Sequence, residues 1–271
     1  MFLPENIDLA HSEKYRLSIR LSPDGFSFYF YSPADPDIFH FQRTNLSNKL
    51  TYSENIKKII FDQGFFTYPF NKTTVVIVSP NYTLVPKQFF DARKSKDIID
   101  FNFHDLNGMS LHDSSESEKY SVVYNMDEGV HSFLSRHLSN PDFKHHTSPL
   151  LNFFNTYENK KGHKQCFADF HDGYVSMFCY VEERLQSAVT FPANNKPDTT
   201  YYIASVWEKL LMDQTKDSLY LCGEIDSHLT VVNDLKRLIN NVERVELKPK
   251  ANLTVEQTQI LPTDVITALC V

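Results

Sequence analysis

Two stretches of the chain decide its fold: residues 15–33, YRLSIRLSPDGFSFYFYSP, and residues 164–191, KQCFADFHDGYVSMFCYVEERLQSAVTF. In the first stretch, apolar and polar residues alternate on both sides of an Asp-Gly pair. The second carries the same pair between two runs of strand-forming residues. Alternation with a period of two is typical of a strand with one buried face, and Asp-Gly is a common turn between antiparallel strands. Each stretch therefore predicts a β-hairpin.

The first hairpin is predicted to turn at Asp24-Gly25. A two-residue turn at that pair sets Leu21 opposite Phe28 and Ile19 opposite Phe30. All four side chains then lie on one face of the hairpin, because residues two apart along a strand point the same way. We expect this face to be buried.

The second hairpin is predicted to turn at Asp172-Gly173, which places Cys166 directly opposite Cys179. Both cysteines then belong to the apolar face of the hairpin, whereas Asp169 and His171 point to the other face. We interpret the two cysteines as reduced, buried, small apolar residues rather than as metal ligands.

The same order of elements is predicted after both hairpins: a third strand, a helix, a buried strand and another helix. In the first half, a strand over 38–46 precedes a helix that begins at about Ser53 and ends at Gly64, and the β-branched run over 73–80 is a buried strand. In the second half the corresponding segments are 184–191, 198–213, 218–225 and 227–241.

The two helices of the second half are each predicted to bury one face. Their inward-facing residues recur at helical spacing: Ile203, Val206, Trp207, Leu210 and Leu211 in one helix, and Val231, Leu235, Leu238 and Ile239 in the other. Between the halves we expect a loop over 105–119, a strand over 119–127 and helices over 127–138 and 148–158.

A three-stranded meander followed by helix–strand repeats is the pattern of a ribonuclease-H-like α/β core. Two such cores in tandem make the duplicated architecture of the actin, sugar-kinase and Hsp70 ATPase group. We therefore predict an α/β chain with two three-layer halves and mixed sheets. The polar stretch 159–164 is the predicted boundary, which gives subdomains 1–158 and 159–271.

Three segments carry a more specific resemblance: VIVSPNYTLVPKQFFD (76–91), FPANNKPDTTYYIASVWEKLLMD (191–213) and SLYLCGEIDSHLTVVNDLKRLI (218–239). They resemble an uncharacterised Bacteroidetes family, the domain of unknown function numbered 3822, over essentially the whole chain. That family looks like a distant relative of the actin-like ATPase clan, in the style of its cell-division and pilus-assembly members. The resemblance implies the duplicated fold and a cytoplasmic bacterial protein, and it brings no assigned activity.

Composition narrows the function. The chain has only 7 glycines among 271 residues, and neither GxGxxG nor GxxxxGK[ST] occurs, which excludes the Gly-rich phosphate loops. The net charge of −7 and the absence of a basic stripe argue against a nucleic-acid partner. We expect a cytoplasmic protein with no signal peptide and no membrane span. The absence of a CxxC pair suits a reducing cytosol, and the cysteines are Cys166, Cys179, Cys222 and Cys270.

Actin-like ATPases hold phosphates on two Asp-x-Gly turns, and the resemblance shows where a residual nucleotide site would lie. Asp169 stands at the place of the second phosphate-loop aspartate, but His171 replaces the glycine. Asp172 and Gly173 form the turn beside it, and Gly223-Glu224 stands where the group has a nucleoside-binding Gly-Gly pair. The first hairpin has no carboxylate on its strand and carries a proline. Each element thus fails as a binding element, and Asp-Gly is first of all a turn.

The residues offer two other candidate sites. In a nuclease of this fold, Asp169 would approach Glu224 or Asp226 to hold metal ions. The paired histidines His145-His146 are expected on a loop or an edge strand and exposed. We assign no catalytic residue, no metal ligand and no cofactor from the sequence.

The sequence therefore favours a non-catalytic actin-like scaffold that acts through protein–protein contacts, with a homodimer as one candidate arrangement. The alternative is a divergent nucleotide- or metal-dependent enzyme that uses Asp169 in an interdomain cleft.

Overall fold

The structure is a computed structural model and describes residues 7–23, 25–113, 119–157 and 164–270. The chain divides into two compact units: residues up to 148 with 250–258, and residues 149–249 with 259–271. Helix α4 (Thr147–Asn155) therefore falls mostly in the second unit. Our predicted subdomains placed this segment in the first half. The predicted boundary at 159–164 lies almost wholly outside the described residues.

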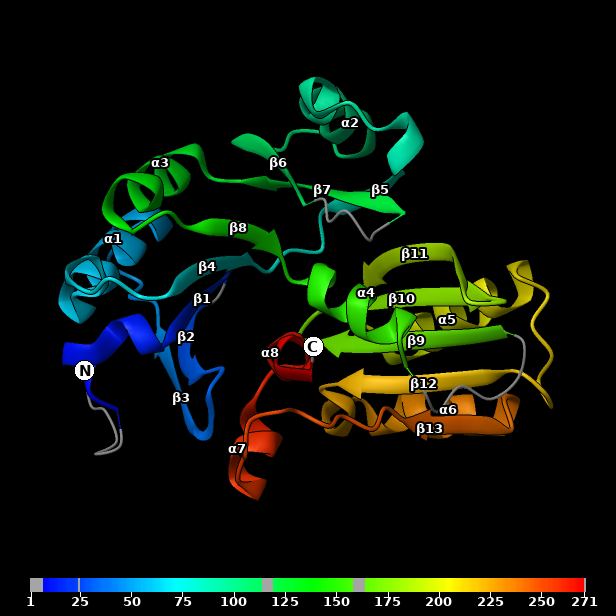
Figure 1. Cartoon of the computed structure of the whole chain (residues 1–271). Helices are drawn as coiled ribbons and strands as arrows, with labels where there is room; N and C mark the ends of the chain where they lie inside the picture. Colours follow the sequence, from blue (N-terminus) through cyan, green and yellow to red (C-terminus); the bar gives the residue numbers. More distant parts are fainter. Residues whose placement is uncertain (1–6, 24, 114–118, 158–163, 271) are drawn as a thin grey trace. The chain divides into compact units, whose positions relative to one another are not determined.

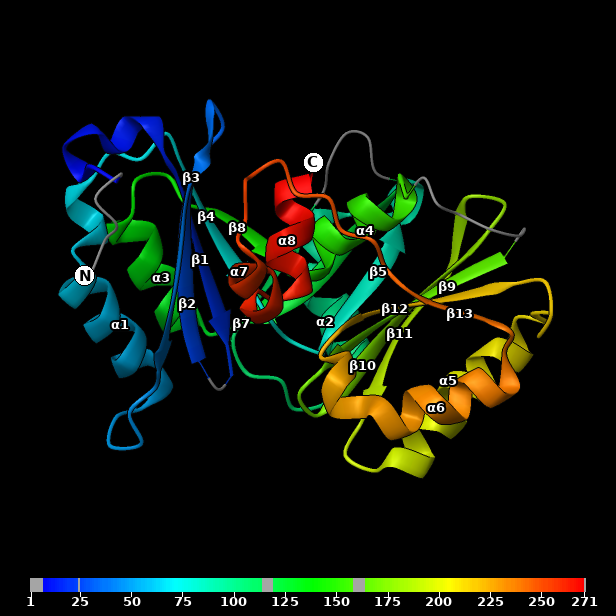
Figure 2. The ribbon, with the colours of Figure 1, turned by 90° about the horizontal axis from the view of Figure 1, so that it is seen from below.

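The first unit is built on a five-stranded sheet of order β3-β2-β1-β4-β8. Strand β1 pairs antiparallel with β2 and parallel with β4, and β4 pairs parallel with β8. Helices α1 and α3 cover one face of this sheet (Figure 2). The elements are β1 (Arg16–Ser22), β2 (Gly25–Ser32), β3 (Asp35–Asn45), α1 (Tyr52–Gln63), β4 (Lys72–Ile77), α3 (Glu128–His137) and β8 (Asp142–His145).

An insertion between β4 and α3 forms a separate antiparallel sheet of order β5-β7-β6, on which α2 packs (Figure 1). Its elements are β5 (Tyr82–Pro86), α2 (Ser95–Asn102), β6 (Met109–Asp113) and β7 (Tyr120–Met126). The predicted loop over 105–119 is therefore wrong in part, because β6 pairs with β7 from Met109 to Asp113. Residues 114–118 of that predicted loop lie outside the described residues.

The second unit repeats the sheet of the first, with order β11-β10-β9-β12-β13. Helices α5 and α6 bury their apolar stripes on one face, and α4 packs aromatic rings on the other, with Phe154 4.3 Å from Phe167 between ring centroids. The elements are β9 (Lys164–His171), β10 (Tyr174–Val181), β11 (Arg184–Pro192), α5 (Lys196–Lys209), β12 (Ser218–Gly223), α6 (Leu229–Leu238), β13 (Asn241–Arg244), α7 (Val255–Ile260) and α8 (Thr263–Cys270).

Short 3-10 helices connect several of these elements. They cover Leu9–Lys14, Phe65–Thr67, Lys87–Phe89, Ala92–Lys94 and Ile225–His228. Within the described part of the chain, no helix is both long and apolar enough to cross a membrane.

Two residues of the predicted apolar stripes lie outside the core. Leu211 is 81% exposed because α5 ends at Lys209 and Leu211 takes a left-handed backbone conformation, which breaks the helical period. Leu238, the last residue of α6, is 43% exposed, and Val232 is buried in the core of the second unit instead.

The register predicted for the first hairpin is wrong by two residues. Ser22 pairs with Gly25 and Leu21 pairs with Phe26, so Gly25 belongs to the second strand and not to the turn, and Pro23 follows directly after the last paired residue of β1. Proline suits the first corner of a tight turn, because its φ is already fixed there and it has no N–H to donate. A shift of two residues keeps every side chain on its predicted face, so the buried face itself is confirmed.

The register predicted for the second hairpin is confirmed. His171 pairs with Tyr174 across the turn, and Cys166 pairs with Cys179. The interpretation of these cysteines as reduced is wrong, because they form a disulfide between β9 and β10 with their Cα atoms 4.1 Å apart. Directly opposed residues on antiparallel strands bring their Cβ atoms within bonding reach of two sulfurs.

Candidate functional site

The candidate site of the second unit centres on Asp169 near the end of β9. Its side chain is 0% exposed, and its Oδ2 lies 2.7 Å from His171 Nε2. Both residues lie on the sheet face opposite to the α5–α6 core, as the register predicts. The carboxylate is thus enclosed in the unit and bound by a neighbouring side chain of the same strand.

His171 occupies the position where an Asp-x-Gly turn has its glycine. Its ring is 14% exposed and stacks on Tyr174 with 4.4 Å between the centroids. The substitution that removes the glycine therefore also supplies the group that covers Asp169. A magnesium ion in such a site needs access to carboxylate oxygens. Here the carboxylate of Asp169 is fully buried and its Oδ2 is in contact with the imidazole.

Gly223 is required by the backbone where β12 meets β9. Its φ is +79°, and a Cβ at this position would lie 2.1 Å from the carbonyl oxygen of Phe170. The next residue, Glu224, donates its backbone N–H to the same carbonyl at 2.8 Å and is exposed. This close approach of two strands explains the glycine without a nucleoside.

Asp172 and Gly173 form the turn of the second hairpin. Asp172 is exposed, and Gly173 has φ +81°, a conformation that favours glycine. The carbonyl of Gly173 accepts a hydrogen bond from the backbone N–H of Ala193 at 2.9 Å. The pair therefore has a structural role that needs no ligand.

Cys222, the neighbour of Asp169 on β12, has the properties of a core residue. Burial, and next the charge of Asp169, raise the pKa of its thiol well above the usual value, while a hydrogen bond with Thr263 acts in the other direction. The thiol stays protonated at neutral pH and is a poor nucleophile.

The carboxylates weighed for a nuclease site do not form one arrangement. Asp226 is 81% exposed and pairs with Arg244, whereas Asp169 is buried with His171. Across the described residues, no group of three or more His, Cys, Asp or Glu side chains is arranged to hold a metal ion.

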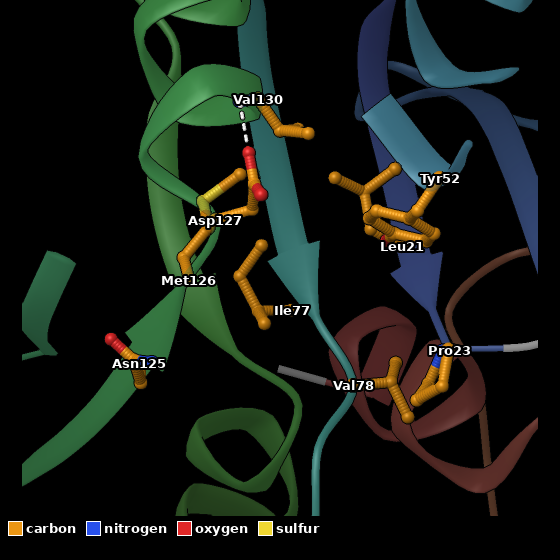
Figure 3. Close-up of a pocket in the computed structure, with 9 residues that line it drawn as sticks. All are labelled: Leu21, Pro23, Tyr52, Ile77, Val78, Asn125, Met126, Asp127 and Val130. Atoms are coloured by element: carbon orange, nitrogen blue, oxygen red, sulfur yellow. Dashed lines mark hydrogen bonds between the residues drawn. The ribbon is translucent and has the colours of Figure 1, made fainter. Parts of the chain in front are cut away.

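The first unit has a pocket of about 340 Å³ at the carboxyl ends of β1 and β4 (Figure 3). Open α/β sheets commonly bind ligands at this edge. We call it the β1–β4 pocket. We call its buried apolar lining the floor and its more exposed lining the rim. The floor consists of Leu21, Ile77, Val78, Met126 and Val130, and the rim of Pro23, Tyr52, Asn125 and Asp127.

Two helices begin beside this pocket, at Tyr52 and just after Asp127, and both N-termini are capped by side chains of the chain, with a carboxylate taking part in each. At α1, Glu54 accepts the backbone N–H of Thr51 at 2.8 Å, in a capping box. At α3, Asp127 Oδ1 accepts the backbone N–H of Val130 at 2.7 Å. Helix N-termini attract phosphates through these N–H groups. Here the chain's own anions take that role.

A buried polar cluster in the first unit was not predicted. His145 and His146 are 0% exposed, so their predicted exposure is wrong. His145 does end an edge strand, but Asp113 of β6 accepts its backbone N–H at 2.6 Å, and the Tyr124 ring packs 5.1 Å from the His145 ring. The insertion thus covers the end of β8, a long-range contact that no local pattern indicates.

Asp113 is the centre of this cluster. Its carboxylate also accepts hydrogen bonds from Ser148 Oγ at 2.5 Å and from Tyr124 Oη at 3.1 Å. Burial raises the pKa of the Asp113 carboxyl to about 6, although these hydrogen bonds and the one from His145 lower it. The cluster joins the insertion to the start of α4. It also holds Thr147, whose Oγ1 lies 2.8 Å from His145 Nδ1, and its hydroxyls are buried from solvent.

A family model described as "Protein of unknown function (DUF3822)" matches residues 4–242 of the chain. A Bacteroides thetaiotaomicron protein with an actin-like ATPase fold and unknown function is similar in structure. The TM-score is 0.84 at 23% identity, over 97% of this chain and 98% of that one. The structure titled PilM–PilN type IV pilus biogenesis complex matches at a TM-score of 0.57 and 11% identity, over 94% and 97%.

No curated protein sequence matches the chain. The structural similarities confirm the predicted α/β, actin-like fold. At these identities they show the fold alone.

Proposed function

We propose that this chain, which belongs to the family described as "Protein of unknown function (DUF3822)", is a non-catalytic scaffold that acts through contacts with other proteins. The observation that carries the proposal is the enclosed Asp169, bound by His171 at the position of the missing glycine. An ATPase of this architecture needs that carboxylate exposed to a metal ion and phosphate.

The first unit supports the same proposal. Its sheet edge presents apolar side chains and two capped helix N-termini where phosphates would bind, and Arg20 stands on β1 where β9 has Asp169. The similarity to PilM, whose structure is titled as a complex with PilN, supplies an example of this fold in a protein–protein complex.

Thermal unfolding with and without ligands tests the proposal. A ligand that binds the native state raises Tm, by the free energy of its binding. We expect ATP, ADP and magnesium, alone or together, to leave Tm unchanged. A rise of several degrees with a magnesium nucleotide that disappears in Asp169→Asn would support the divergent enzyme instead.

Two further parts of the proposal need their own measurements. We place the protein in the cytoplasm, and fractionation of the native host tests this. A homodimer is one arrangement of such a scaffold, and sedimentation equilibrium over a range of concentrations measures whether it forms. Affinity purification from the host would identify other protein partners.

A further inference from the structure

We infer that the β1–β4 pocket receives a peptide segment of a partner protein, which inserts one bulky apolar side chain and places a lysine or arginine beside Asp127. The inference rests on the proposed scaffold function and names the chemistry of its contact. It assigns a binding role to a part of the sheet edge that has no residue in common with the Asp169 site.

The floor of the pocket is suited to an apolar side chain. Leu21, Ile77 and Met126 come from the ends of three different strands, and Val130 comes from α3. They surround a volume of about 340 Å³, which lies at the small end of the range of roughly 300–1,000 Å³ for ligand sites. Such a volume fits one large anchor side chain, the kind of group that carries most of the affinity in protein interfaces.

Among the described residues, the rim carries one acidic side chain, Asp127, and no basic one. Asp127 is exposed, and one of its carboxylate oxygens caps α3 through Val130. The other oxygen receives no hydrogen bond from the described residues, and Figure 3 shows it on the side of the other lining residues. In the part of the chain that the structure describes, no lysine, arginine or histidine lines the pocket. A cation beside the apolar anchor is therefore favoured, and an anion is repelled.

The charge of the whole chain favours the same partner. A net charge of −7 attracts a cationic segment from a distance and speeds its encounter with the pocket. Pro23 and Asp127 at the rim are exposed, so the pocket is open to a segment that approaches from solvent. A peptide that carries both an apolar side chain and a neighbouring cation satisfies the floor and the rim together.

Selection from a library of displayed random peptides on the full chain tests the inference. We expect enriched peptides to share a bulky apolar residue next to lysine or arginine. Their dissociation constants are then measured by fluorescence anisotropy with labelled synthetic copies. Val78→Phe fills the pocket, and we expect it to raise Kd at least about tenfold.

Asp127→Asn is the second variant, because asparagine caps a helix as well as aspartate and removes only the charge. We expect it to raise Kd about twofold to fivefold, the range of an exposed ion pair, and to leave Tm nearly unchanged. Glu128→Gln is the matched control: it changes the net charge equally, one residue away, and does not line the pocket. It should leave Kd unchanged.

The inference is overturned if no peptide is enriched, if enriched peptides lack the cation, or if binding is unaffected by Val78→Phe and Asp127→Asn. Binding of a second copy of this chain, or of a small amphiphile in place of a peptide, would also contradict it. None of these outcomes touches the proposed scaffold function, which fails only if a nucleotide binds through Asp169. The two failures are therefore distinguishable.

Discussion

The strand pair β1–β4 of the first unit and the pair β9–β12 of the second end with the same backbone pairing and different side chains. In the second unit Phe170 pairs with Gly223, and in the first unit Leu21 pairs with Ile77 at the corresponding place. In both, the residue after the second strand donates its N–H to the first strand at 2.8 Å, Glu224 to Phe170 and Val78 to Leu21. The two units therefore share the backbone hydrogen bonds at this place and differ in the side chains.

The side chains at the carboxyl ends of these strands differ between the two units. The second unit closes its edge around a polar pair, Asp169 and His171, and needs glycine at 223 for the strands to meet. The first unit leaves a pocket at its edge, with Ile77 and Val78 in the floor. At the carboxyl ends of the central strands, the second unit has a buried polar pair and the first unit has a pocket. The proposed function is based on this difference.

The largest expected effect comes from Gly223→Ala. The added Cβ would meet the carbonyl oxygen of Phe170 at 2.1 Å in a left-handed backbone, so we expect a loss of about 3–5 kcal/mol in the free energy of unfolding. Urea denaturation measures it. Gly25→Ala is the control, since its Cβ would lie no closer than 3.4 Å to a neighbour. A loss below about 1 kcal/mol for Gly223→Ala would contradict the close approach.

The second largest effect is expected from removing the disulfide of the second unit. Replacing Cys166 and Cys179 by alanine opens a loop with a sequence separation of 13, which we expect to cost about 3 kcal/mol. Unfolding in urea without reductant measures the loss, and reductant should bring the wild type close to the variant. Unreduced, denatured wild type should expose two thiols, Cys222 and Cys270. A count of four would show that the cysteines are reduced.

A smaller effect depends on pH through Asp113 in the first unit. Its pKa is raised to about 6 in the folded chain, from 3.8, so the folded state holds the proton more tightly than the unfolded state. The resulting stabilisation is complete below about pH 4 and is lost as pH rises through about 6.

The stability difference between wild type and Asp113→Asn should therefore change by about 2 kcal/mol between pH 4 and pH 7, in favour of the wild type at low pH. Denaturation curves at several pH values measure it. An equal difference at every pH would mean that the Asp113 pKa is not raised.

The smallest effect compares the two Asp-Gly pairs directly. Gly173 has φ +81° in its turn, whereas Gly25 lies in β2 outside the left-handed region. We expect Gly173→Ala to cost about 1 kcal/mol and Gly25→Ala clearly less, by thermal unfolding. Equal costs would contradict the different turns.

The sequence predicted the strand–strand–strand–helix–strand–helix order shared by the two units, because alternation and helical spacing are local signals. It also predicted the second hairpin's register, and hence that Asp169 and His171 share a face. Side chains two residues apart on a strand lie on the same face, so the contact between Asp169 and His171 could also have been predicted from the sequence. The sequence did not predict β5, α2, β6 and β8 of the first unit, or β13, α7 and α8 of the second. The first register failed because Pro23 moved the turn away from the Asp-Gly pair.

Long-range contacts account for what the sequence did not predict. The burial of His145 depends on Asp113 and Tyr124 from the insertion. The β1–β4 pocket combines residues from positions as distant as Leu21 and Val130, so no single pattern marks it. Both features depend on which elements the fold brings together.

The central claim is that the buried Asp169 contacts His171 and therefore does not bind a magnesium nucleotide. Isothermal titration of magnesium ATP into the full chain tests it most directly, with Asp169→Asn as the comparison. We predict no saturable heat for either protein. Saturable binding to the wild type that is lost in Asp169→Asn would contradict the claim and make the second unit a working nucleotide site.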